Sequence, residues 1–187
     1  DMSGQADFQK NFEELNIIPM SISYEFEPCD ILKAREMVIS RKHKYVKAEG
    51  EDFNSIMVGI MQQKGNIHLN IGSPLTSEEI AAAAKCDKND RYQLIRHAVD
   101  IRVIEGYKLW PNNYIAYDIL NHSYKYSEKY AEAGVEQFVA YMEKQLDTVE
   151  PELNRADLRK HFLEIYANPV YAKELLAKER ITKSILL

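Results

Sequence analysis

The chain has 187 residues, of which 45% are apolar and 28% charged, and its net charge is -5. This length suits one compact domain, and the acidic balance argues against a nucleic-acid partner, which normally meets a basic face. No apolar run approaches the roughly 20 residues that a membrane-spanning helix needs. Cys29 and Cys86 are too few and too far apart for a metal site or a disulfide framework, so we expect two reduced thiols.

The first part of the chain, to about residue 75, mixes helix and strand patterns. A short helix is predicted over 7–16, because Phe8, Phe12 and Leu15 recur at helical spacing. A strand follows over 17–26 and stops at Pro28. Its residues alternate between an apolar side, with Ile18, Met20, Ile22, Tyr24 and Phe26, and a polar side, with Ser21, Ser23 and Glu25.

Two helices and a second strand complete this part. Asp30 is expected to cap a helix that runs to about residue 41, and a further helix is predicted over 51–62. The second strand, 66–71, ends at Gly72-Ser73-Pro74 and places His68 and Asn70 on one face. Two strands do not make a stable sheet alone, so we expect further strands from outside this segment.

From Thr76 onward the pattern is helical throughout. Thr76 and Glu79 form a capping box that starts a helix. Later helices are predicted over 90–108, 112–124, 126–149 and 154–167, and Pro169 is expected to open a last one. We therefore predict an α/β fold, a partial mixed sheet with covering helices over 1–75, followed by an all-helical C-terminal extension over 76–187.

Two segments carry a resemblance to a known family. Residues 16–25 read Asn-Ile-Ile-Pro-Met-Ser-Ile-Ser-Tyr-Glu, and residues 64–75 read Lys-Gly-Asn-Ile-His-Leu-Asn-Ile-Gly-Ser-Pro-Leu. The first resembles the fourth conserved block of the glycerophosphate acyltransferase family, and the second resembles a later strand of the same enzymes. The likeness covers about residues 5–75. The helical tail matches no family that we can name.

The resemblance implies a transfer of a fatty acyl group from an acyl thioester, carried by acyl carrier protein or coenzyme A, to a glycerol-phosphate hydroxyl. The family's general base is the His of a His-x4-Asp block upstream of the resembling segment, and no histidine of this chain is followed by Asp at that spacing. We therefore expect the C-terminal part of an acyltransferase, with no catalytic residue, metal or cofactor of its own. By resemblance, substrate-binding residues are Pro19, Ser21, Ser23, Tyr24 and Glu25.

Several patterns have both a functional and a structural interpretation. The basic run from Arg41 to Lys47, which includes His43, suits either anionic lipid headgroups or a solvated helix end. We expect a cytoplasmic protein, to which the lipid interpretation adds peripheral contact with the inner face of the membrane. A cluster of tyrosines, Tyr114, Tyr117, Tyr124, Tyr126 and Tyr130, suits a membrane interface or, more simply, helix packing.

Two further patterns allow either a metal-binding or catalytic role or a purely structural one. Asp118 and His122 lie one helical turn apart, which suits a metal site or a surface pair. For His68, no acidic residue or cysteine lies at a spacing in the sequence that would indicate a metal-ligand or catalytic pair. For the whole chain, the alternatives are a non-catalytic helical module that binds a partner protein and an unrelated α/β enzyme.

Overall fold

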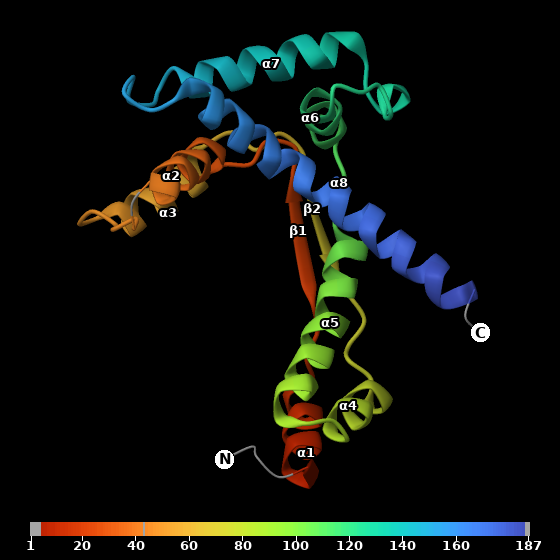
Figure 1. The fold of residues 1–187 in the computed structure, drawn as a ribbon. Helices are drawn as coiled ribbons and strands as arrows, with labels where there is room; N and C mark the ends of the chain where they lie inside the picture. The colour runs from red at the N-terminus through yellow and green to blue at the C-terminus, as the bar shows by residue number, and fades with distance from the viewer. Residues whose placement is uncertain (1–4, 43, 186–187) are drawn as a thin grey trace. The chain divides into compact units, whose positions relative to one another are not determined.

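A computed structural model describes residues 5–42 and 44–185, so that His43 lies outside the described residues. This part of the chain is mostly helical, with a small antiparallel sheet of two strands. The elements are α1 (Gln5–Leu15), β1 (Met20–Tyr24), α2 (Asp30–Lys42), α3 (Glu51–Met61), β2 (Ile67–Ile71), α4 (Ser77–Ala84), α5 (Lys88–Gly106), α6 (Pro111–Asn121), the 3-10 turn η1 (Ser127–Lys129), α7 (Glu132–Leu146) and α8 (Arg155–Ile185) (Figure 1).

The chain folds into two compact units, each made from separated stretches. The first combines the residues up to Ser23 with His68–Lys108 and the residues from Leu175 onward, and the second combines Tyr24–Ile67 with Leu109–Glu174. The predicted boundary near residue 75, between an α/β part and a helical extension, follows the order of elements along the chain. It stays a prediction.

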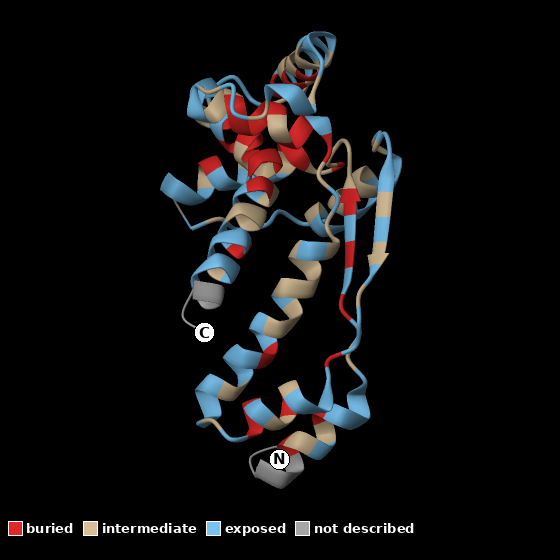
Figure 2. Cartoon of the chain, turned by 90° about the vertical axis from the view of Figure 1, so that its right-hand side faces the viewer, coloured by how far each residue is buried: buried red, intermediate tan, exposed pale blue. Residues whose placement is uncertain are grey.

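The second unit has the larger core, which lies among α2, α6, α7 and α8. Figure 2 shows the buried residues gathered in these helices. Phe138, Met142 and Phe162 are almost wholly buried there, together with Val38 of α2. Asn113 joins two elements of this unit, because its Oδ1 accepts from the Trp110 backbone N–H at 2.7 Å and its Nδ2 donates to the Tyr166 carbonyl at 2.8 Å.

The core of the first unit lies where α1, α4 and α5 pack. The predicted helix is present as α1, and its Phe8 and Phe12 are buried with their ring centroids 4.4 Å apart, whereas Leu15 at the end of the helix is exposed. The predicted capping box is confirmed: Glu79 N–H donates to the Thr76 hydroxyl at 3.2 Å, and Thr76 N–H donates to the Glu79 carboxylate at 2.8 Å. Glu79 also pairs with Arg102 of α5, which fixes α4 against α5.

The two strands pair with each other in a register that backbone hydrogen bonds define. Gly72 N–H donates to the Pro19 carbonyl at 2.9 Å, and Leu75 N–H donates to that of Ile17 at 3.0 Å. This register places Met20 opposite Ile71. The same register places Ile22 opposite Leu69, so that these four apolar side chains share one face of the sheet.

The sheet is buried on its polar side and exposed on its apolar side. Ser21 and Ser23 are buried, whereas Ile18, Met20, Ile22, Leu69 and Ile71 are each between 43% and 66% exposed. The end of α5 lies against the serine side at Gly106, where an added Cβ would come within 2.9 Å of the Ser21 hydroxyl. The predicted alternation along the strand is confirmed, and its buried side is the polar one.

Two predicted helix boundaries are wrong. Pro169 lies inside α8 and does not open a new helix. A proline within a helix removes one backbone hydrogen bond, but Tyr166, Ala167 and Val170 around it are buried in one core, which holds both sides of the proline in helical conformation.

The second boundary concerns the helix predicted over 126–149. The structure has the turn η1 first and begins α7 only at Glu132. The Asp118 carboxylate accepts the backbone N–H of Tyr126 at 2.9 Å and the hydroxyl of Tyr130 at 2.8 Å. These bonds stabilise a tight turn in this segment. The other predicted helices agree with the structure to within a few residues.

Candidate functional site

The predicted substrate-binding residues lie along β1 and at its two ends. Pro19 immediately precedes the strand, as its missing N–H requires, and its carbonyl takes part in the pairing with Gly72. Glu25 follows the strand. Its carboxylate accepts the backbone N–H of Asn66 at 2.9 Å and the Asn66 side-chain amide at 2.8 Å. Tyr24 is half-buried.

Glu25 fixes the turn that leads into β2. Gly65 has a backbone φ of +61°, and a Cβ at this position would lie 2.6 Å from a Glu25 carboxylate oxygen and 3.1 Å from the Phe26 ring. A side chain at Gly65 would therefore displace Glu25 from Asn66. This contact gives Glu25 a structural role in joining the two resembling segments.

Ser21 and Ser23 are 5% and 1% exposed, and neither hydroxyl has a hydrogen-bond partner among the described residues. A buried hydroxyl without a partner carries a free-energy cost on the order of 1–3 kcal/mol. Asn70 and His68 lie on the same side of the sheet and are partly buried. The polar side of the sheet is therefore covered, and the last residue of α5, Gly106, lies against it at Ser21 and Asn70.

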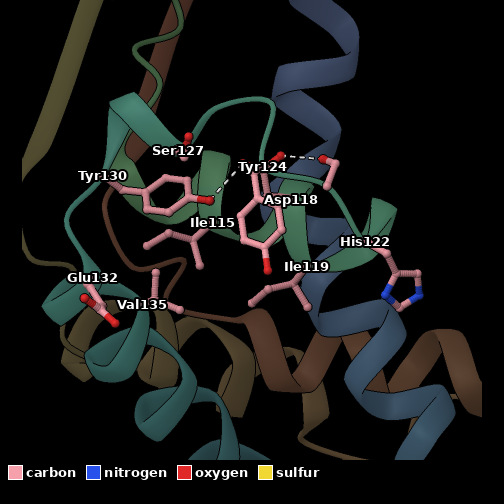
Figure 3. Close-up of a pocket in the computed structure, with 10 residues that line it drawn as sticks. Ile115, Asp118, Ile119, His122, Tyr124, Ser127, Tyr130, Glu132 and Val135 are labelled. Atoms are coloured by element: carbon pink, nitrogen blue, oxygen red, sulfur yellow. Dashed lines mark hydrogen bonds between the residues drawn. The ribbon is translucent and has the colours of Figure 1, made fainter.

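A cavity of about 650 Å³ lies in the second unit, where the end of α6 meets η1 and the start of α7. Figure 3 shows Ile115, Ile119 and Val135 lining it, with Tyr130 and Glu132 on one side and His122 on the other. The walls are mainly apolar. A cavity of this size and lining suits a small apolar ligand.

Asp118 is the central polar residue of this cavity wall, and its oxygens are engaged. The carboxylate accepts the Ser123 hydroxyl at 2.6 Å, the Tyr126 backbone N–H at 2.9 Å and the Tyr130 hydroxyl at 2.8 Å. Asp118 is only 3% exposed, so the surface-pair interpretation of Asp118 and His122 is wrong. The His122 ring points away from Asp118 (Figure 3), and no group of potential metal ligands forms among the described residues.

The tyrosine cluster packs helices together, as the simpler interpretation predicted. Tyr117 lies within 5.1 Å of Tyr126 and 4.7 Å of Tyr171, measured between ring centroids, and Tyr114 lies 5.0 Å from Tyr126. Burial and the nearby Glu174 carboxylate raise the pKa of Tyr126 to about 12. Tyr124 is the exception, because its side chain is 85% exposed.

A second buried carboxylate, which the sequence did not reveal as a site, lies at the start of α2. Asp30 is fully buried. Its Oδ2 accepts the Tyr166 hydroxyl at 2.7 Å and the Tyr141 hydroxyl at 2.9 Å, and its Oδ1 accepts the Ile31 N–H at 2.6 Å. Burial raises the pKa of the Asp30 carboxyl to about 6. Its two tyrosine partners are 111 and 136 residues away in the chain, so no local pattern points to this cluster.

His161 is the histidine that the structure buries most deeply among those described. It is 1% exposed, its Nδ1 lies 2.6 Å from a Glu164 oxygen, and its Nε2 has no partner among the described residues. A His–Glu pair is a familiar acid–base arrangement. Here the ring is enclosed by the core, which gives a substrate no access to it.

Comparisons with known proteins add no assignment, because no protein-family model, no curated protein and no solved structure matches the chain. Across residues 5–42 and 44–185, no helix is both long and apolar enough to cross a bilayer. The side chains described above bond mainly to one another. The open features of the molecule are its apolar surfaces.

Proposed function

We propose that the chain is part of an acyltransferase that moves a fatty acyl group from an acyl thioester to a glycerol-phosphate hydroxyl, with the catalytic His and Asp outside these 187 residues. In this proposal the donor is acyl carrier protein or coenzyme A. The protein works in the cytoplasm, in peripheral contact with the inner face of the membrane, and it has no nucleic-acid partner.

One observation carries the proposal: the two segments that resemble the family are adjacent strands, and the sheet that they form is open on its apolar face. About 40 residues separate the segments in the chain, yet Pro19 pairs with Gly72 and Glu25 with Asn66. An apolar sheet face normally packs against a second layer. This arrangement favours two strands of a larger mixed sheet in an α/β domain.

The geometry refines the roles of the resembling residues. Ser21 and Ser23 are buried on the polar side of the sheet, where the last residue of α5 meets Ser21, whereas Pro19 and Glu25 lie at the ends of the paired strands. Within the proposal, an acyl chain or an acceptor would contact the strand ends, at Pro19 and Glu25.

The test begins with the coding sequence upstream of Asp1, which we expect to encode His-x4-Asp followed by glycine- and arginine-bearing blocks. The product of the whole reading frame should transfer a labelled acyl group to glycerol 3-phosphate or its monoacyl derivative. Substitution of the upstream His by Ala should abolish the transfer, since the hydroxyl then has no general base. The 187-residue chain alone should show no turnover.

Two results would overturn this proposal. The first is measurable acyl transfer by the 187-residue chain alone. The second is a reading frame with no His-x4-Asp whose product transfers no acyl group. In the second case the leading function becomes a non-catalytic interaction module, in which the helical part of the chain from residue 76 onward binds a partner protein.

A further inference from the structure

Helix α3 presents its large apolar side chains outward. Phe53, Ile56, Met57, Ile60 and Met61 recur at helical spacing on one face, and they are between 40% and 77% exposed. No residue of this helix is buried. Surface helices normally turn such a face toward the core, so α3 is inverted with respect to the usual arrangement.

The inward side of α3 is formed by small residues. The Cys29 thiol, just before α2, contacts the Ser55 carbonyl at 3.6 Å, and a Cβ added to Gly59 would lie 3.6 Å from the same sulfur. Serine and glycine on this side let α3 lie close to the segment that begins α2 (Figure 1). The packing therefore fixes which face of α3 is exposed.

The most basic stretch of an acidic chain precedes α3 and contacts its first turn through Tyr45 and Lys47. Residues 41–47 contain four Lys or Arg residues and no acidic residue, while the whole chain carries a net charge of -5. Arg41, Lys42 and Lys44 are exposed, and among the described residues none of the three has an acidic partner. The acidic first turn of α3 is engaged locally, since Asp52 pairs with Lys47, and Glu51 accepts the Tyr45 hydroxyl.

We propose that α3 and residues 41–47 form a docking surface for an anionic lipid bilayer. The five apolar side chains enter the boundary between headgroups and acyl chains, and Arg41, Lys42 and Lys44 contact the anionic headgroups. With 11 residues, α3 is too short to span a bilayer and lies along its surface.

The surface formed by α3 and residues 41–47 differs in charge from the open apolar face of the sheet. The exposed sheet residues Met20, Ile22, Leu69 and Ile71 lie on strands that contain no lysine or arginine. An apolar face without cations suits a protein layer, whereas an apolar helix beside unpaired cations suits an anionic membrane. The inference locates the membrane contact, and it holds whether or not the protein transfers acyl groups.

The test is a flotation assay of the full 187-residue chain with vesicles of phosphatidylcholine, alone or mixed with phosphatidylglycerol. The chain should bind the mixed vesicles, and added salt should weaken the binding because exposed charges are screened. The double variant Ile56→Gln/Ile60→Gln should lower the partition coefficient roughly tenfold or more. The variant Lys42→Gln/Lys44→Gln should lower it by roughly tenfold on anionic vesicles and leave binding to neutral vesicles unchanged.

Each variant has a matched control. Lys85→Gln/Lys88→Gln removes the same charge from exposed positions just after α4 and at the start of α5, and Ile22→Thr/Leu69→Thr removes two apolar side chains from the sheet face. Both should bind mixed vesicles as the unmodified chain does. Circular dichroism establishes that each variant keeps its helical content.

Three outcomes would overturn the proposal. In the first, the unmodified chain does not bind anionic vesicles. In the second, the sheet variant Ile22→Thr/Leu69→Thr loses binding while the α3 variant Ile56→Gln/Ile60→Gln keeps it. In the third, the chain is a dimer, the α3 variant is a monomer, and neither binds vesicles. The last would assign the α3 face to a second copy of the chain. If the product of the whole reading frame binds vesicles but transfers no acyl group, the proposed reaction is refuted and the proposed membrane contact is not.

Discussion

At the scale of single residues, Asp30 shows how a buried carboxylate is held. It accepts hydrogen bonds from two tyrosine hydroxyls and one backbone N–H, and one of the tyrosines, Tyr166, also accepts the backbone N–H of Glu27 at 2.9 Å. These bonds favour the charged form, but burial outweighs them, and the pKa of Asp30 rises from 3.8 to about 6. The cluster ties the start of α2 to α7 and α8.

This raised pKa makes a prediction about stability. Between pH 4 and pH 6 the folded state binds more protons at Asp30 than the unfolded state, so this residue's contribution to the free energy of unfolding falls as pH rises through that range. A shift of about two pKa units corresponds to roughly 2–3 kcal/mol. The cost of Asp30→Asn should therefore be largest near pH 4 and smaller by up to this amount at pH 7.

Denaturant titrations at several pH values, followed by the fluorescence of Trp110 in the same unit, measure this difference. Glu152→Gln removes an exposed carboxyl group and serves as the control. A cost of Asp30→Asn that stays constant from pH 4 to pH 7 would contradict the prediction.

At the scale of elements, the close approach of α5 to the sheet depends on one missing side chain. A Cβ at Gly106 would lie 2.0 Å from the Asn70 amide nitrogen and 2.9 Å from the Ser21 hydroxyl. Gly106 ends α5, where its lack of a side chain lets the end of the helix lie against Ser21 and Asn70. This contact lies on the buried, polar side of the sheet, and the apolar side is exposed.

We expect Gly106→Ala to lower the free energy of unfolding by roughly 1–3 kcal/mol, because the new methyl group has no space. Adding Asn70→Ala should recover part of this loss, since it removes the nearest atoms. Gly134→Ala is the control: its Cβ would meet only the Ile115 side chain at 3.9 Å, and within α7 it should be neutral or slightly stabilising. Additive effects of Gly106→Ala and Asn70→Ala in a double-mutant cycle would show that this contact is unimportant.

At the scale of the whole molecule, the exposed apolar surfaces set the behaviour of the chain in solution. Single exposed apolar residues are normal, but contiguous patches mark interaction sites. Here the sheet face and the α3 face each gather several such side chains on neighbouring positions. We assign the first to a protein layer and the second to a membrane.

The protein-layer assignment can be tested by placing charges on the sheet face. In the 187-residue chain, Ile22→Lys/Leu69→Lys should reduce self-association, because both positions are exposed. In the product of the whole reading frame, the same change should destabilise the protein by several kcal/mol, since two unpaired charges would be buried. Light scattering measures the first effect and thermal unfolding the second. Equal tolerance in both proteins would mean that nothing covers this face.

Local signals in the sequence were sufficient for most of the elements. The Thr76 capping box, the alternation along β1 and the spacing of Phe8 and Phe12 all involve residues that are neighbours in the chain, and the structure confirms them. Pro169 does not begin a new helix, because burial of the residues around it in the core outweighs the local preference of proline for a helix start.

The sites were harder to predict, for a physical reason. Asp30 reads locally as a helix cap, and its role depends on Tyr141 and Tyr166, which the sequence places far away. Alternation along β1 shows that two faces differ without showing which one is covered. That choice depends on α5, whose Gly106 is a single residue with no pattern around it.

The interleaving of the two units has a consequence for folding during synthesis. The bond between Tyr166 and Asp30 joins residues 136 apart, and the first unit gains its last stretch only from Leu175 onward. At about 5–20 residues per second, α2 leaves the ribosome roughly 7–30 seconds before its partner on α8. During that interval the face of α2 that the core later buries stays uncovered, and transiently exposed apolar surface of this kind makes an emerging chain prone to aggregation.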